Sequence, residues 1–143
     1  MFSNILVAAD GSMGSDQAVT AAAEIAGAFD AKLTICHVFH IPEHYRDDLI
    51  GPLRDSIRED GEDILAHAVK VAAGLGVEAD SRLVSTGHPA EAIVTLAGKL
   101  GVGLIVLGAR GKSTDGSREI GSVGSAIVAG AKASVMVVRR NAA

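Results

Sequence analysis

The sequence predicts an α/β fold in which an open, five-stranded parallel sheet carries helices on both faces. Short apolar runs alternate with amphipathic segments along all 143 residues, which is the pattern of β-α-β units joined by right-handed crossovers. Residues 104–107 are apolar at every position, as a strand covered by helices on both faces requires. No composition shift marks a boundary, so we expect a single domain over residues 1–143.

Five runs rich in β-branched residues or Leu are the predicted strands. The third is the most polar and is expected at a sheet edge, and the last, which closes the chain, is expected at an edge as well. The predicted strands are residues 5–9, 33–39, 79–84, 104–107 and 134–138.

The segments between the strands show the apolar spacing of helices. Pro89 stands at a first-turn position, where its missing N–H group is no loss. Pro42, Gly51 and Pro52 predict that residues 41–53 form a loop. The predicted helices are residues 15–29, 55–75, 89–100 and 122–131.

Composition excludes several functional classes. The formal net charge is −4, which disfavours nucleic acid as a partner because duplex binding needs a basic surface. Cys36 is the only cysteine, so an internal disulfide is excluded and a reducing compartment is favoured. The N-terminus shows no signal peptide and no apolar run is long enough to span a bilayer. We therefore expect a cytoplasmic protein with no membrane partner.

A glycine pattern follows the fourth predicted strand, where an open α/β sheet can bind a ligand. Gly108, Gly111, Gly121 and Ser122 meet the spacing G-x2-G-x9-G-[S/T]. Glycines allow positive φ and let backbone N–H groups approach phosphate closely. The last glycine and the serine open a predicted helix, whose unpaired N–H groups and dipole favour anions. Basic residues of the same loop are Arg110, Lys112 and Arg118.

Two other nucleotide motifs are not met. A Walker A loop ending at Gly111 requires a glycine five positions earlier, where the chain has Val106. A dinucleotide pattern G-x-G-x-x-G ending at Gly124 requires a glycine at position 119, which is Glu.

The complete glycine spacing resembles the nucleotide-binding signature of the universal stress protein family, in its ATP-binding branch. Further landmarks in matching order are residues 5–12, 37–38, 87–93, 121–123 and 134–138. The resemblance covers the whole chain. It implies a Rossmann-like fold of the adenine nucleotide alpha hydrolase type, with strand order 3-2-1-4-5, and a homodimer through residues 134–138.

The resemblance also implies the binding residues. The backbone of Val38 would contact the adenine edge, Asp10 would face the ribose and phosphates, and the glycine loop would surround the phosphates. Asp115 and Glu119 add two carboxylates to that loop, so we expect Mg²⁺ beside ATP, AMP or ADP. No catalytic and no metal-ligating residue is predicted. The implied set is Ala8, Ala9, Asp10, Val38, Leu107, Gly108, Arg110, Gly111, Gly121, Ser122 and Val123.

Other interpretations stay open beside these roles. Asp10 is also a good turn residue before Gly11. Cys36 and His37 are adjacent in a predicted strand, so they point to opposite faces and form no catalytic dyad. A metal site at His37, His40 and His44 is disfavoured by irregular spacing.

Three functions fit the sequence. The leading one is a regulatory ATP-binding protein, in which nucleotide biases conformation or partner choice. The second is a slow ATP hydrolase, for which Asp10 with Arg110 or Lys112 offers the best available set. The third is an interaction module that binds no nucleotide.

Overall fold

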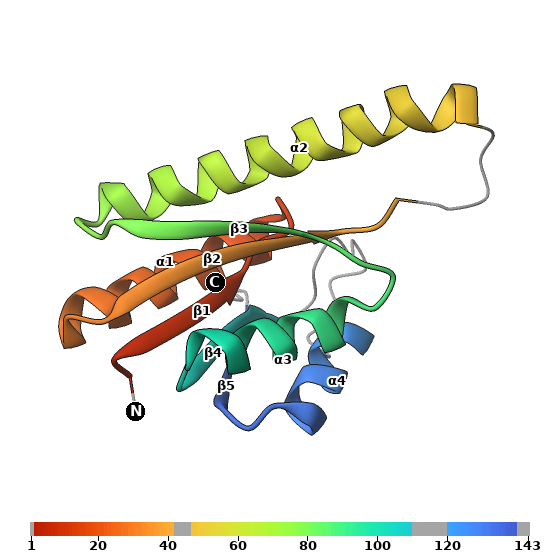
Figure 1. Cartoon of the computed structure of the whole chain (residues 1–143). Coiled ribbons are helices and arrows are strands. Elements are labelled where there is room, and N and C mark those ends of the chain that lie inside the picture. Colours follow the sequence, from red (N-terminus) through yellow and green to blue (C-terminus); the bar gives the residue numbers. More distant parts are fainter. Residues whose placement is uncertain (1, 42–46, 110–119, 140–143) are drawn as a thin grey trace.

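The computed structural model describes residues 2–41, 47–109 and 120–139. Strands and helices alternate throughout these ranges (Figure 1). In chain order they are β1 (Asn4–Ala8), α1 (Met13–Phe29), β2 (Lys32–Phe39), α2 (Asp47–Gly74), β3 (Ala79–Ser85), α3 (Pro89–Leu100), β4 (Leu104–Gly108), α4 (Ser122–Gly130) and β5 (Ser134–Val138).

The strands form one parallel sheet in the order β3-β2-β1-β4-β5. This confirms the predicted fold class and strand order, with β3 and β5 at the two edges. From β1 the chain winds outward to β2 and β3, then returns across the sheet to β4 on the other side of β1. Such a reversal opens a crevice beyond the carboxyl ends of the central strands.

The helices cover the sheet in two layers, α1 and α2 on one face and α3 and α4 on the other (Figure 1). Successive residues of β1 pack into different cores because side chains alternate along a strand. Val7 belongs to the core beneath α1 and α2, whereas Leu6 belongs to the core beneath α3 and α4. The same alternation places Cys36 and Val38 of β2 in the second core.

Local sequence signals set the ends of α1 and α3. The Ser12 hydroxyl caps α1 by accepting from the Ser15 N–H group at 3.1 Å. Asp30 ends that helix in the left-handed conformation, with φ of 52°. Pro89 opens α3, and Gly101 closes it at φ of 68°, a conformation that favours glycine.

The beginning of α2 differs from the prediction. Residues 41–53 were expected to form a loop, yet the helix begins at Asp47 and contains Pro52. Proline's fixed φ is itself helical, and at the sixth position of α2 its missing N–H group costs the helix one backbone hydrogen bond. Gly51 and Pro52 therefore do not stop the helix. The other boundaries match the predicted ones or differ from them by one or two residues, and α3 and β5 match at both ends.

None of the helices in the described ranges combines the length and the apolar character that crossing a bilayer requires.

An added methyl group is expected to change the free energy of unfolding in opposite directions at two helical glycines. At Gly98 a Cβ atom meets open space, whereas at Gly61 it stands 2.8 Å from Leu83 Cδ1 and 3.0 Å from His37 Cδ2. Because Ala is the better helix former, Gly98→Ala raises the free energy of unfolding by roughly 0.5–1 kcal/mol. Gly61→Ala lowers it, since the packed side chains must move. Denaturant unfolding measures both, and a stabilised Gly61→Ala protein would contradict the close packing of α2.

Candidate functional site

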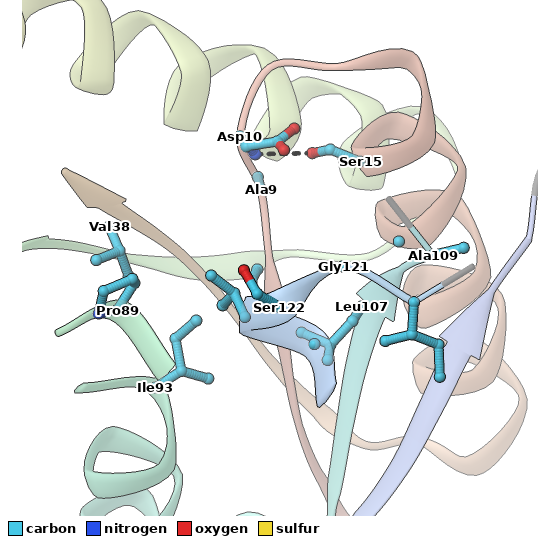
Figure 2. A pocket seen from close by; sticks show the side chains of 15 residues that line it. Ala9, Asp10, Ser15, Val38, Pro89, Ile93, Leu107, Ala109, Gly121 and Ser122 are labelled. Carbon is cyan, nitrogen blue, oxygen red and sulfur yellow. Dashed lines mark hydrogen bonds between the residues drawn. The ribbon is translucent and has the colours of Figure 1, made fainter. Parts of the chain in front are cut away.

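A cavity of about 610 Å³ lies at the carboxyl end of the sheet, within the size range of small-molecule sites. It is built from the ends of β1, β2 and β4 and from the first turns of α1, α3 and α4. Figure 2 shows these segments around it. The lining residues are Ala8, Ala9, Asp10, Ser15, Val38, Pro89, Ile93, Leu107, Gly108, Ala109, Ile120, Gly121, Ser122, Val123 and Gly124.

The structure brings together most of the residues predicted from the sequence. Nine of the eleven line this cavity: Ala8, Ala9, Asp10, Val38, Leu107, Gly108, Gly121, Ser122 and Val123. Arg110 and Gly111 lie outside the described residues. The charged residues of the same loop, Lys112, Asp115, Arg118 and Glu119, lie outside them as well.

One side of the cavity is apolar. Val38 of β2 lies there with Pro89 and Ile93 of α3, as Figure 2 shows. The two α3 residues were not predicted as site residues. Their spacing of four places them on one helix face, but only the position of α3 over the sheet shows that this face meets the cavity.

The turn between β1 and α1 is held by hydrogen bonds of its own. Asp10 Oδ1 accepts from the Ser12 N–H group at 2.8 Å. The Asp10 N–H group donates to Ser15 Oγ at 3.0 Å, the bond drawn in Figure 2. Ser15 is buried and was missed by the sequence analysis. Asp10 is thus a turn residue, and the same turn holds it at the cavity wall, where its contact with a ligand stays a prediction.

The N-terminus of α4 faces the cavity, and no side chain of the described residues caps it. Gly121 is the N-cap residue, and Ser122, Val123 and Gly124 form the first turn beside the cavity. The first N–H groups of a helix have no acceptor within the helix, and the dipole is positive there. In α1, by contrast, the Ser12 hydroxyl fills the corresponding position. The start of α4 is therefore the better place for an anion.

Backbone hydrogen bonds fix the position of that helix start. The Gly121 N–H group donates to the Ala109 carbonyl at 3.0 Å, and the Ala109 N–H group donates to the Val138 carbonyl at 2.9 Å. The first turn of α4 is thereby tied to the ends of both β4 and β5. A helix N-terminus that is held in place binds an anion more favourably, because little reorganisation accompanies binding.

Gly108 and Gly121 meet different surroundings although they belong to one motif. A Cβ atom on Gly108 would stand 3.0 Å from the backbone oxygen of Gly14, so the approach of α1 to β4 requires glycine there. Among the described residues, a Cβ atom on Gly121 would have no heavy atom within 4 Å. Packing thus explains Gly108, whereas none of the described residues around Gly121 excludes a side chain.

The cysteine and the histidine of β2 both have structural roles. Burial raises the pKa of the Cys36 thiol to about 12, so the group is a protonated, apolar core residue rather than a nucleophile. The buried His37 ring bonds through Nδ1 to the Ala9 carbonyl at 2.7 Å. His44 lies outside the described residues, and within those ranges no three His, Cys, Asp or Glu side chains gather as metal ligands.

Comparison with known proteins identifies the family. The model of the universal stress protein family matches residues 1–139. The chain belongs to the universal stress protein family. Universal stress protein YxiE of Bacillus subtilis is 34% identical over 153 aligned residues, which cover 97% of this chain and all of that protein. Universal stress protein Rv1636 of Mycobacterium tuberculosis is 34% identical over 142 residues, covering 96% of each chain.

Solved structures of the family show the same fold. UspA from Lactobacillus plantarum superimposes with a TM-score of 0.83 at 28% identity, covering 96% of this chain and 98% of that one. A universal stress protein in complex with cAMP has a TM-score of 0.73 at 30% identity, covering 96% and 97% of the two chains.

Proposed function

We propose that this universal stress protein binds an adenine nucleotide, ATP with Mg²⁺, in the cavity at the carboxyl end of its sheet. The nucleotide acts as a regulatory ligand in a stress response rather than as the substrate of a fast reaction. The observation that carries the proposal is the N-terminus of α4, which has no side-chain cap among the described residues and opens into a cavity with one apolar side.

The apolar side of the cavity suits the adenine ring, and the start of α4 suits the phosphates. The adenine ring would lie against the backbone of Val38, with Ala8 and Ala9 beside it and the apolar side chains of α3 opposite. The phosphates would take the free N–H positions of the first α4 turn and the Ser122 hydroxyl. We propose Arg110 and Gly111 as further phosphate contacts.

The family supports the class of ligand. The relative solved with cAMP carries an adenine nucleotide, and at 30% identity it shares nearly the whole length of this chain. A regulatory role fits the chemistry of the described residues, because the Asp10 carboxylate is already engaged by the Ser12 N–H group. A carboxylate held in this way is a weak candidate for the base that orients an attacking water.

Gly121→Ala tests the phosphate position. The added methyl group stands in open space in the free protein, but it would occupy room proposed for phosphate. We expect the affinity for Mg-ATP, measured by isothermal titration calorimetry, to fall about tenfold or more. The free energy of unfolding should fall by no more than about 1 kcal/mol, the cost of alanine at an N-cap.

Gly98→Ala is the matched control, because it adds the same group to a helix position away from the cavity. Its affinity should equal that of the wild type. Unchanged ATP affinity in Gly121→Ala would contradict the proposed phosphate position.

An assay for adenine nucleotide that stays bound during purification distinguishes the three functions considered. Heat-denatured wild-type protein should release adenine nucleotide that the Gly121→Ala variant does not retain. Steady production of ADP above background would instead favour a hydrolase. If the protein binds no nucleotide at millimolar ATP and magnesium, the third function, an interaction module, is favoured.

We also propose that β5 pairs with the same strand of a second copy. The Val138 carbonyl accepts from Ala109 beside β4, so the neighbouring residue Val137 turns its N–H group toward the open edge. Light scattering at micromolar concentration should give a dimer mass for the wild type. Val137→Pro, which removes that N–H group without touching the β4 ladder, should give a monomer. A monomeric wild type would contradict the pairing.

A further inference from the structure

The backbone ladder between β1 and β2 ends at a side-chain hydrogen bond from His37. Ala8 pairs with Cys36 in the parallel register, and the Ala9 N–H group adds one more bond, to the Cys36 carbonyl, at 2.8 Å. A regular parallel ladder would continue with a bond from the Val38 N–H group to the Ala9 carbonyl. Within the described part of the chain, however, the Ala9 carbonyl takes its hydrogen bond from the His37 ring at 2.7 Å.

Because of the direction of the Val38 backbone, this change of hydrogen-bond donor to the Ala9 carbonyl affects the cavity. In a strand, the N–H and C=O groups of one residue point to one neighbour and those of the next residue point to the other. The Cys36 carbonyl points to β1, and the Phe39 carbonyl accepts from Thr86 beside β3. Val38 therefore directs both of its backbone polar groups to the side of β1, past the end of that strand. Val38 is also a lining residue of the cavity (Figure 2).

The proton on the His37 ring can be assigned from its partner. A carbonyl oxygen only accepts, so Nδ1 must carry the hydrogen and donate it. The neutral Nδ1–H tautomer and the imidazolium both meet this requirement. The bond to Ala9 is therefore kept in either charge state of the ring.

The neighbouring helix accommodates the ring. Gly61 of α2 lies over it, and a Cβ atom there would stand 3.0 Å from His37 Cδ2. Glycine in a helix interior is unfavourable by roughly 1 kcal/mol relative to alanine. This glycine leaves room for the imidazole beneath α2, on the face of the sheet opposite the Val38 side chain.

We infer that His37 is a positioning residue for base recognition, an inference that rests on the proposed nucleotide site. By holding the Ala9 carbonyl, the His37 ring ends the β1–β2 ladder one bond early. With no partner among the described residues, the Val38 N–H and C=O groups stay available as one donor and one acceptor at the cavity. Such a pair complements the N1 acceptor and the 6-amino donor of adenine, and it mismatches the same edge of guanine. His37 thus selects the base without touching it.

Two variants at position 37 test the inference. His37→Leu keeps the approximate bulk but removes the donor, so the Ala9 carbonyl is expected to bond to the Val38 N–H group instead. His37→Asn keeps an N–H donor one bond from Cγ, as Nδ1 is. Titration calorimetry with Mg-ATP and Mg-GTP should show about tenfold loss of the preference for ATP in His37→Leu, the effect of one hydrogen bond. His37→Asn should retain the preference.

A role confined to packing would give another result. If His37 only packs, His37→Leu would change the melting temperature but keep the wild-type ratio of ATP to GTP affinity. That outcome would overturn the inference. Failure of the wild type to bind either nucleotide would instead contradict the proposed function, which is a separate result.

Amide hydrogen exchange on the nucleotide-free protein tests the ladder itself. The Val38 amide of the wild type should exchange faster than the Cys36 amide, and in His37→Leu it should slow by about tenfold or more. A Val38 amide that is as protected as Cys36 in the wild type would overturn the inference, whatever the nucleotide result.

Discussion

β1 ends at Ala8, whereas β2 on one side continues to Phe39 and β4 on the other continues to Gly108. The space beyond Ala8 is therefore bounded by two neighbouring strands and left without a strand of its own. Because the winding reverses at β1, the helices after these strands leave on opposite faces of the sheet. The cavity, the Asp10 turn and the start of α4 all occupy positions set by this early ending.

The architecture was largely predictable because it depends on patterns that lie within short segments. Apolar strands alternating with amphipathic helices allow few arrangements other than a parallel sheet covered on both faces. The start of α2 was not predictable in the same way. Gly51 and Pro52 weaken a helix locally, but the helix runs through them, so local preference alone placed the boundary wrongly.

The site was predictable only in part. Resemblance to the family indicated the motif residues, and nine of them line the cavity. Pro89, Ile93 and Ser15 were missed because their contribution depends on where α1 and α3 pack against the sheet. The bond from His37 to Ala9 depends on the register of β1 against β2, which no local pattern reveals. The glycine spacing likewise could not separate Gly108, required by packing, from Gly121, which faces open space.

A crystal structure of the protein with Mg-ATP tests the central claim most directly. The account predicts phosphate oxygens within hydrogen-bond distance of the backbone N–H groups of Ser122, Val123 and Gly124, with the adenine ring at the end of β2 beside Val38. A nucleotide bound elsewhere, or one whose phosphates leave the first turn of α4 without contact, would contradict it.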